Sequence, residues 1–558
     1  MVRAFSSGEP INEYVSPYHC LTMLLKSNPA ILNEKAVIQD RVIDYKTFQK
    51  EMNALAAFLR KRWKLQRQEI VSVCAAGSIE GLVAFFALNK LGAVNARIFN
   101  GVKEDKMRTN LLNFNSTVIL TDEYNLPVLS RVVRETAIRR VLVMSDCDDE
   151  MIRAFWSEHP NLQILTYREA IRQGEELGDV GCEARTARED LASILYTSGS
   201  SGEPKPISIP NRVYTNMVDI VCRTTNIQKC DGERVVSVVS HEYPYAAINC
   251  TVMVLLMGKT LIMPKHNNDG KLDFRELLSE KPHRIQAIPN FYKLLQADGE
   301  AGILTERDFA SFNSLISGGE RYLDSEKREL LQFLAARKSK PLLIDGFGFG
   351  ELGSATALKF GMSPYFLLMN GIRAKAIDPE TKEDLPVDQE GILCFSGPTI
   401  ADGYFNNEKA TAESFVKDEN GTLWFRSDTY GLVHGKKKRL VQLGGRIREY
   451  FITNDGHGNF VKVYAGTVED VITGSGIVAD CIVVPSDGGA MPSPVAYVVL
   501  SPDCKLEQEQ AKRAIQECCK SLEQFAQPSR INVVEQIQRT RAGKKDYGFY
   551  RNYKTGRQ

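Results

Sequence analysis

The sequence YTSGSSGEPK occupies residues 196–205 and follows a short apolar run at residues 193–195. The apolar run predicts a strand, and glycine at positions 199 and 202 permits positive φ angles and close approach of the backbone. Hydroxyl and amide donors around these glycines can hold a phosphate chain, whose charge Lys205 can neutralise. The order of residues is not that of a Walker loop. By itself the segment therefore predicts either a phosphate-binding loop or a flexible surface loop.

Before this loop, short β-branched runs alternate with helical patterns. Residues 70–74 and 118–121 predict buried strands, while residues 47–63 and 78–91 predict helices, the first of them amphipathic. Alternating strands and helices are typical of a parallel sheet with helices on both faces. We therefore expect an α/β fold around the loop.

After the loop, the pattern changes twice. Residues 374–425 are rich in turn-forming residues and predict a small β subdomain. From about residue 449 a second α/β unit begins, with predicted strands at residues 478–484 and 495–500. The lysine- and glycine-rich residues 435–448 precede this unit and are a candidate hinge.

The chain has 558 residues, which is too long for one hydrophobic core. We predict an α/β protein with two domains. The large N-terminal domain, residues 1–446, would consist of stacked α/β subdomains and the small β subdomain. The small C-terminal domain, residues 447–558, would be a mobile α/β unit.

Composition argues against several classes of protein. The 70 Lys and Arg residues balance the 69 Asp and Glu residues, so no overall charge attracts nucleic acid or an anionic membrane. No apolar run reaches the roughly 18 residues of a membrane helix, and residues 1–10 lack the apolar core of a signal peptide. The 12 cysteines have no metal-ligand spacing. We therefore expect free thiols, a cytoplasmic location, and neither nucleic acid nor membrane as a partner.

The segment Y-T-S-G-S-S-G-E-P-K resembles the phosphate loop of adenylate-forming enzymes. This superfamily includes acyl-CoA synthetases, the adenylation domains of nonribosomal peptide synthetases, and luciferases. Nine further segments fall in the family's order and near its spacing, namely residues 45–59, 89–95, 315–320, 346–351, 391–415, 425–428, 445–448, 463–469 and 539–544. The resemblance therefore covers nearly the whole chain and favours the phosphate-binding interpretation of the loop.

This resemblance implies that the N-terminal domain binds ATP and an acid. In the family the loop holds the β- and γ-phosphates, and the matching residues here are Thr197, Ser198, Gly199, Ser200, Ser201, Gly202 and Lys205. Lys205 would also assist catalysis, because a charged leaving group needs such donors in place as its charge develops. Glu351, together with Thr197, would coordinate Mg²⁺, a cation that usually takes one or two carboxylates and keeps several waters.

Two segments are similar to those that bind adenine in the family. Gly318, Gly319 and Glu320 match the segment that packs on the base. Phe347, followed by Gly348, matches an aromatic residue that stacks on it. The resemblance therefore implies that the adenine lies between these two segments, which are separated by some thirty residues in the sequence.

The resemblance also implies roles for residues near the predicted domain boundary and the C-terminus. Asp428 would accept both ribose hydroxyls, as a carboxylate can, and Arg446 would be the second ribose contact. Arg448 occupies the family's hinge position. Lys544 ends the segment R-T-R-A-G-K and would be the main catalytic residue, holding the attacking carboxylate and the α-phosphate together. Without the resemblance, Lys544 would be interpreted as part of a solvated basic tail.

The nature of the acid is indicated by the sequence SHEYP at residues 240–244. This segment resembles the H-N-Y-P of stand-alone aryl-acid adenylating enzymes and the H-x-Y of aryl-CoA ligases, and it lacks the aspartate that holds an α-ammonium group. The acid is therefore expected to be aromatic or another acid that is not an α-amino acid. His241 would act near the carboxylate, or else be a packed core histidine.

Three further residues are candidates for the acid pocket. Glu242 would face an amino or hydroxyl group of the substrate; the alternative is that it turns to solvent or pairs with a basic residue, since a buried carboxylate needs a partner. Asn249 and Phe291 are weaker candidates.

The implied reaction has two steps. The carboxylate attacks the α-phosphorus of MgATP to give acyl-AMP and pyrophosphate, and a thiol then displaces AMP. The thiol would belong to CoA or to the phosphopantetheine arm of a separate acyl or peptidyl carrier protein. Two alternatives stay open: an amine as the acceptor, and a catalytically silent relative that only binds a nucleotide or acyl group. The second alternative rests on departures from the family pattern at Pro206, Gly350 and Ser427.

Overall fold

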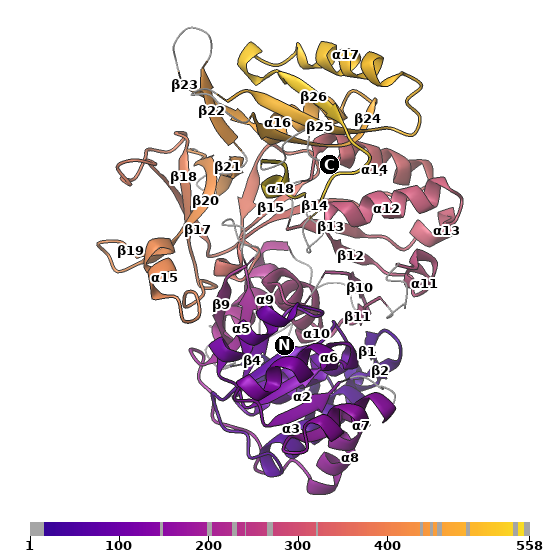
Figure 1. Cartoon of the computed structure of the whole chain (residues 1–558), viewed down its shortest axis with the longest axis vertical. Helices are drawn as coiled ribbons and strands as arrows, with labels where there is room; N and C mark the ends of the chain where they lie inside the picture. Colours follow the sequence, from indigo (N-terminus) through magenta and orange to yellow (C-terminus); the bar gives the residue numbers. More distant parts are fainter. Residues whose placement is uncertain are drawn as a thin grey trace.

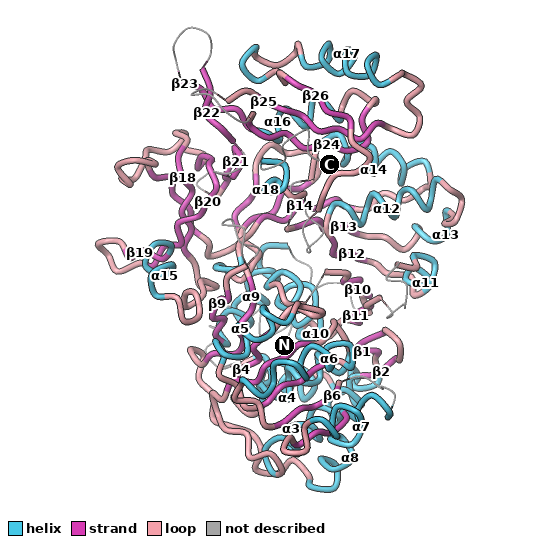
Figure 2. The backbone as a smooth tube through the Cα atoms, in the orientation of Figure 1, coloured by secondary structure: helices cyan, strands magenta, loops and turns pink. Residues whose placement is uncertain are grey.

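The computed structural model describes most of the chain. The described residues are 16–144, 149–197, 204–225, 232–239, 241–264, 272–319, 322–435, 439–446, 450–454, 460–486, 492–539 and 545–551. In Figure 1 the N-terminal part lies at the bottom in indigo and purple, and the C-terminal part lies at the top in yellow. Figure 2 shows helices and strands in both the N-terminal and the C-terminal part, as the predicted α/β class requires.

The N-terminal part contains a seven-stranded sheet in the order β7-β6-β5-β3-β4-β8-β9. Its neighbouring strands are parallel except β8 and β9, which form an antiparallel hairpin around the predicted phosphate loop. The strands are β3 (Ile70–Cys74), β4 (Val94–Arg97), β5 (Val118–Thr121), β6 (Arg140–Val143), β7 (Gln163–Thr166), β8 (Leu191–Tyr196) and β9 (Pro206–Pro210). The prediction of a parallel sheet is confirmed.

Helices between these strands bury their apolar side chains against the sheet. They are α3 (Tyr45–Lys61), α4 (Ile79–Lys90), α5 (Glu104–Phe114), α6 (Leu126–Val132), α7 (Asp149–Glu158) and α8 (Tyr167–Leu177). Ser78 begins α4 by accepting a hydrogen bond from the backbone N–H of Gly81. Pro206 starts the edge strand β9, where a residue without an N–H is tolerated.

A second, larger sheet runs through the middle of the molecule in the order β17-β18-β20-β21-β16-β15-β14-β13-β12-β10-β11-β1-β2. The strands from β1 to β14 along this path are parallel, and those from β14 to β17 are antiparallel. The parallel part contains β1 (Lys35–Ile38), β11 (Thr260–Ile262), β10 (Arg234–Ser237), β12 (Arg284–Ala287), β13 (Ser314–Gly318) and β14 (Leu342–Phe347), with β2 (Val42–Asp44) antiparallel at its edge.

The antiparallel part of this sheet contains the β-rich region predicted at residues 374–425. Its strands are β15 (Ala357–Phe360), β16 (Phe366–Leu368), β17 (Arg373–Ile377), β18 (Gly391–Ser396), β19 (Phe415–Lys417), β20 (Leu423–Val433) and β21 (Leu440–Arg446). Hydrogen bonds through β21 and β16 make these strands continuous with the parallel ones. Because β21 is part of the sheet, much of the stretch predicted as a hinge is a strand.

Helices also cover the larger sheet. They are α2 (Pro17–Ser27), α9 (Asn211–Thr225), the π-helix η5 (Tyr245–Val252), α10 (Met253–Leu256), α11 (Phe274–Ser279), α12 (Pro289–Glu300), α13 (Glu306–Phe309), α14 (Asp324–Ala336) and α15 (Glu408–Ser414). Among the described residues, no helix is both long and apolar enough to cross a bilayer. The cysteines of the described part are free thiols, as expected.

The C-terminal part has its own hydrophobic core, which includes Val468, Ile472 and Ile515. It consists of the hairpin β22 (Tyr450–Asn454) and β23 (Phe460–Tyr464), the sheet β24 (Val478–Pro485), β25 (Pro494–Leu500) and β26 (Arg530–Val533), and the helices α16 (Ala465–Thr473), α17 (Gln508–Cys519) and α18 (Tyr547–Arg551). The domain boundary at residues 446/447 and the mobility of this part stay predictions, because residues 447–449 lie outside the described ones.

The C-terminal part packs on α12 and α14 of the N-terminal part (Figure 1). The backbone N–H of Asp324 donates to Asp470 at 3.2 Å, and the hydroxyls of Ser325 and Thr473 are 3.0 Å apart. Lys293 on α12 pairs with Glu326 at 2.7 Å and lies 3.7 Å from Asp480 on β24. These polar contacts hold the two parts together in the conformation described here.

Candidate active site

The hairpin of β8 and β9 carries the predicted phosphate loop. The backbone N–H of Thr197 donates to the carbonyl of Lys205 at 2.9 Å and so closes the base of the loop. Thr197 is buried, with 5% of its surface exposed. The predicted phosphate ligands between these two residues lie outside the described residues, namely Ser198, Gly199, Ser200, Ser201 and Gly202.

Tyr404 joins the loop to the predicted metal ligand. The ammonium of Lys205 lies 5.0 Å from the centre of the Tyr404 ring, and the Tyr404 hydroxyl donates to Oε1 of Glu351 at 2.6 Å. Glu351 is 6% exposed and lies in the short 3₁₀ helix η6 (Gly350–Leu352). Burial and the negative charge of Glu351 raise the pKa of Tyr404, so its hydroxyl keeps its proton and acts as a donor. The structure thus brings Lys205 to the ring and Glu351 to the hydroxyl of one tyrosine.

The sequence by itself indicates no role for Tyr404. It lies within residues 391–415, one of the segments that resembles the family, but nothing in its neighbours distinguishes it from a core tyrosine. Its position becomes evident only in the folded protein, where the backbone of residues 403–405 pairs with the edge strand β9. The N–H of Ser208 donates to the carbonyl of Gly403, and the N–H of Phe405 donates to the carbonyl of Pro206. This pairing covers the edge of the sheet and places the Tyr404 ring beside Lys205.

Glycines allow the segments around Glu351 to meet closely. A Cβ atom on Gly348 would lie 1.8 Å from the carbonyl oxygen of Ser354, so no side chain fits there. A Cβ atom on Gly350 would lie 3.1 Å from Cγ of Pro244 and 3.3 Å from Cγ2 of Thr197. Pro244 and Thr197 therefore crowd Gly350, which gives this departure from the family pattern a steric reason.

Asp428 has the free acceptor expected of a ribose ligand. It lies on β20, and its Oδ2 atom is buried without a hydrogen-bond partner among the described residues. A buried carboxylate oxygen without a donor is costly, so this atom fits a ligand that brings hydroxyl groups. Its charge raises the pKa of Tyr404, which places it near the Tyr404–Glu351 pair. Arg446 pairs through its backbone with Thr429, the residue next to Asp428; the Arg446 side chain is outside the described part.

The predicted adenine segments lie at the carboxyl ends of two adjacent parallel strands. β13 ends at Gly318 and β14 at Phe347, and Gly318 pairs in register with Gly346. Gly319 has φ of +82°, a conformation that favours glycine. Ligands of open α/β sheets bind at this end of the strands. The Phe347 ring lies edge-on to Phe349 with 5.0 Å between centroids.

Three further predicted residues of the nucleotide and catalytic sites lie outside the described residues. Glu320 follows Gly319 directly, Arg448 lies just beyond β21, and Lys544 lies in the stretch before α18. Their roles remain predictions from the sequence. Gly348 is described and follows Phe347 at the end of β14.

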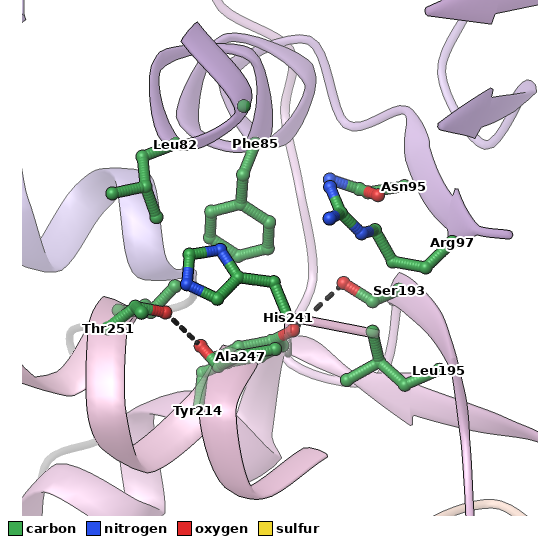
Figure 3. A pocket seen from close by; sticks show the side chains of 12 residues that line it. Leu82, Phe85, Asn95, Arg97, Ser193, Leu195, Tyr214, His241, Ala247 and Thr251 are labelled. Atoms are coloured by element: carbon green, nitrogen blue, oxygen red, sulfur yellow. Dashed lines mark hydrogen bonds between the residues drawn. The ribbon is translucent and has the colours of Figure 1, made fainter. Parts of the chain in front are cut away.

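His241 lies at one side of a small cavity of about 30 Å³ (Figure 3). Its ring packs against Gly77, where an added Cβ would lie 3.0 Å from the ring. Burial and the positive charge of Arg97 lower the pKa of His241 to about 3, so the imidazole is neutral at physiological pH. His241 is therefore buried, as a core histidine would be, but it faces a cavity with polar walls that include Asn95 and Ser193.

The other acid-pocket candidates have different surroundings. Glu242 is 3% exposed and accepts a hydrogen bond from the backbone N–H of Asn100 at 3.1 Å, so the expectation that it turns to solvent is wrong. Asn249, on η5, donates to the carbonyl of Gly353 at 3.0 Å and ties this helix to the loop after Glu351. Phe291 packs in a core cluster with Phe274, with 5.1 Å between ring centroids, and does not line the cavity.

Comparison with known proteins gives two matches to protein-family models. The model described as AMP-binding enzyme matches residues 28–405, and the model described as AMP-binding enzyme C-terminal domain matches residues 467–544. A 4-coumarate-CoA ligase 2 of Narcissus pseudonarcissus is 24% identical over 88% of this chain and 83% of its own length. Luciferin 4-monooxygenase of Photinus pyralis is 22% identical over 71% of each chain.

Solved structures of the same architecture match nearly the whole chain. The anthranilate CoA ligase AuaEII, in complex with anthranoyl-AMP, is 18% identical, with a TM-score of 0.80 and 97% of both chains covered. A benzoate CoA ligase from Burkholderia xenovorans LB400 is 17% identical, with a TM-score of 0.74, covering 96% of this chain and 99% of its own. At these identities the likeness establishes a shared fold.

Proposed function

This chain belongs to the AMP-binding enzyme family, and on that premise we propose that it activates a carboxylic acid as an acyl-adenylate and transfers the acyl group to CoA. In the first step a carboxylate oxygen attacks the α-phosphorus of ATP. The bond from this phosphorus to the oxygen that bridges to the β-phosphate breaks, and pyrophosphate leaves with that oxygen. In the second step the CoA sulfur attacks the acyl carbon, AMP leaves, and the thiol proton passes to solvent.

The observation that supports this proposal most strongly is the arrangement around Tyr404. A cation at Lys205, a buried carboxylate at Glu351 and an oxygen of Asp428 that has no hydrogen-bond partner among the described residues gather near one ring. A nucleotide triphosphate needs all three kinds of group: a cation for the phosphates, a carboxylate for Mg²⁺ and an acceptor for the ribose hydroxyls.

Magnesium enters this site as part of the substrate MgATP. Among the described residues, no group of three or more His, Cys, Asp or Glu side chains could hold a metal ion by itself. One carboxylate from Glu351, supported by the hydroxyl of Thr197, fits an ion that brings phosphate oxygens and water as its remaining ligands. Mg²⁺ would neutralise charge on the phosphates, while Lys205 would hold the departing pyrophosphate.

Lys544 is proposed as the residue that holds the attacking carboxylate beside the α-phosphate. Both groups are negative, so a cation between them removes the repulsion that otherwise opposes their approach. The acid is proposed to be aromatic or another acid without an α-ammonium group. The absence of the ammonium-binding aspartate supports this, as do relatives named for 4-coumarate, benzoate and anthranilate. A separate carrier protein is the alternative to CoA as the thiol acceptor, and a cytoplasmic location is a further part of the proposal.

Acid-dependent exchange of pyrophosphate into ATP tests the first step. We expect exchange with members of an aryl-acid panel, and a loss of about 10²–10³-fold in kcat for Lys544→Met, because a preorganised cation that stabilises developing charge contributes on this scale. Lys505→Met, at an exposed position in the C-terminal part, is the matched control. No exchange with any acid of the panel would favour the catalytically silent alternative.

Mass spectrometry of the products tests the second step. The purified enzyme, ATP and an acid active in the exchange assay would be incubated with CoA, with a phosphopantetheine-bearing carrier protein, or with a simple amine. We expect the CoA thioester. An amide in the third mixture and no thioester in the first two would replace the proposal with an amide ligase.

A further inference from the structure

The cavity beside His241 lies under helix α4 on a face of the seven-stranded sheet. Asn95 and Arg97 are two residues apart on the central strand β4, so both side chains project from the same face. Ser193 on β8 pairs in register with Asn95 and lines the same cavity. Central parallel strands are normally apolar on both faces, because helices cover both. A row of polar residues here is therefore unusual and calls for a ligand or a structural partner.

Among the described residues, Arg97 has no charged partner. One of its terminal nitrogens donates to the carbonyl of Ala75 at 3.1 Å, but its Nε is buried without a hydrogen bond. Arg97 is 5% exposed, and within the described part of the chain no carboxylate forms an ion pair with it. An uncompensated buried cation is strongly unfavourable, so the empty side of this guanidinium fits an anion.

The neighbours of Arg97 are compatible with an anion. Oδ1 of Asn95 is also buried without a partner, and because no described hydrogen bond holds this amide, it can turn its NH₂ group toward an acceptor. Figure 3 shows Arg97 and Asn95 entering from one side and His241 from the other, beside the ring of Phe85. His241 is neutral there, since its pKa is about 3. The described walls therefore carry one positive charge and no negative charge.

The size of the cavity limits what it can hold. Its volume of about 30 Å³ exceeds the roughly 10–15 Å³ needed for one water but leaves room for only a few atoms. An aromatic ring does not fit, whereas a carboxylate does. The remainder of any ligand that reaches Arg97 must lie outside the cavity.

The segment that carries His241 connects this cavity to the predicted phosphate loop. The carbonyl of Glu242 accepts a hydrogen bond from the backbone N–H of Tyr196, the last residue of β8 before the loop. Two residues further on, Pro244 lies against Gly350 beside Thr197. The segment from His241 to Pro244 therefore runs from the cavity to the base of the predicted phosphate loop.

We propose that Arg97 binds a second carboxylate, so that the acid activated by this enzyme is a dicarboxylic acid with its non-reacting carboxylate in the cavity. This inference rests on the proposed acid activation and specifies its substrate class. It makes Arg97 a residue for substrate specificity, with Asn95 as an additional donor. The reaction itself is unchanged, since only one of the two carboxylates attacks ATP.

The test compares matched acids in the pyrophosphate-exchange assay, such as pentanoate with glutarate and benzoate with terephthalate. For wild-type enzyme we expect a higher kcat/KM for the dicarboxylic member of a pair. Arg97→Met should reduce the ratio of dicarboxylic to monocarboxylic kcat/KM by about 10- to 100-fold, mainly through KM, as expected for the loss of a hydrogen-bonded ion pair. Arg97→Lys should restore part of the ratio, because it keeps the charge but not the planar fork.

Thermal unfolding of the ligand-free protein distinguishes binding from a structural role. Arg284 is the matched control, because it is equally buried at 5% but pairs with Glu233 at 2.6 Å. Arg284→Met should lower the melting temperature, since it removes a partner from a buried carboxylate, whereas Arg97→Met should leave it unchanged or raise it. Glutarate or terephthalate should stabilise the wild-type protein but not Arg97→Met.

Each result decides a separate point. Exchange with monocarboxylic acids and no preference for dicarboxylic ones overturns the inference and leaves the proposed function in place. Equal losses for both acids of a pair in Arg97→Met also overturn it, because Arg97 would then serve the reacting carboxylate. A melting temperature for Arg97→Met as low as that of Arg284→Met, with the ratio unchanged, assigns Arg97 a structural role. No exchange with any acid overturns the proposed function and this inference together.

Discussion

Replacing Tyr404 by phenylalanine removes one oxygen atom and leaves the ring beside Lys205 in place. That oxygen donates to Glu351 at 2.6 Å, and Glu351 is 6% exposed, so water has little access to replace the bond. A hydrogen bond to a buried charged group contributes about 1.5–3 kcal/mol. We expect Tyr404→Phe to lower the free energy of unfolding by about 2 kcal/mol.

The same change should affect the proposed metal site. If Glu351 coordinates Mg²⁺, the Tyr404 hydroxyl orients its carboxylate, and loss of such an orienting partner typically costs about 10- to 100-fold in metal affinity. Titration of free Mg²⁺ at fixed ATP in the pyrophosphate-exchange assay measures this effect. Tyr124→Phe is the control, because Tyr124 is 66% exposed and both its stability and its Mg²⁺ dependence should match wild type. Reduced stability of Tyr404→Phe with an unchanged Mg²⁺ requirement would refute the role of Glu351 as a metal ligand.

Three further predictions concern other parts of the molecule. Burial lowers the pKa of His241 to about 3 in the folded protein, whereas in the unfolded chain this histidine binds a proton near pH 6.5. The free energy of unfolding should therefore fall as the pH drops from about 6.5 toward 3, by up to about 1.4 kcal/mol per pH unit. Chemical unfolding between pH 4 and 7 should show a smaller slope for His241→Gln, and equal slopes would contradict the neutral buried imidazole. Gly348→Ala places a methyl group 1.8 Å from the Ser354 carbonyl and should destabilise the protein by about 1–3 kcal/mol; a melting curve like that of wild type would disprove the close contact. Lys293→Ala removes the cation near Asp480 and should increase the rate of limited proteolysis between the N- and C-terminal parts. An unchanged rate would show that this contact does not hold the two parts together.

Local sequence pattern was sufficient for much of the fold. The runs at residues 70–74 and 118–121 form β3 and β5 with the predicted bounds, because short β-branched runs buried on both faces leave little choice of secondary structure. The prediction at residues 435–448 was less successful, since β21 occupies part of this stretch. Its lysines and glycines suggested a flexible linker, but pairing with β20 and β16 supplies hydrogen bonds that composition does not reveal.

The candidate site was likewise predicted only in part from the sequence. The resemblance of its motifs to the family predicted roles for Lys205, Glu351 and Asp428, and the match to the AMP-binding enzyme family agrees with the family that the motifs indicated. Tyr404 and Arg97 were missed, because each looks ordinary among its neighbours in the sequence. Their importance depends on what lies next to them after folding.

The loop at residues 196–205 and the motifs in register with it determined the family and the class of fold from sequence alone, and their resemblance to the family predicts the two-step chemistry. Motifs of this kind are local, because the backbone conformations and donors that hold a phosphate chain come from consecutive residues. Only the tertiary structure decided that Tyr404 contacts both Lys205 and Glu351, and that Arg97 is buried with no carboxylate partner among the described residues. Both observations depend on burial and on contacts between residues that are far apart in the chain. Those contacts, rather than the neighbours in sequence, determine the free energy of a buried charge.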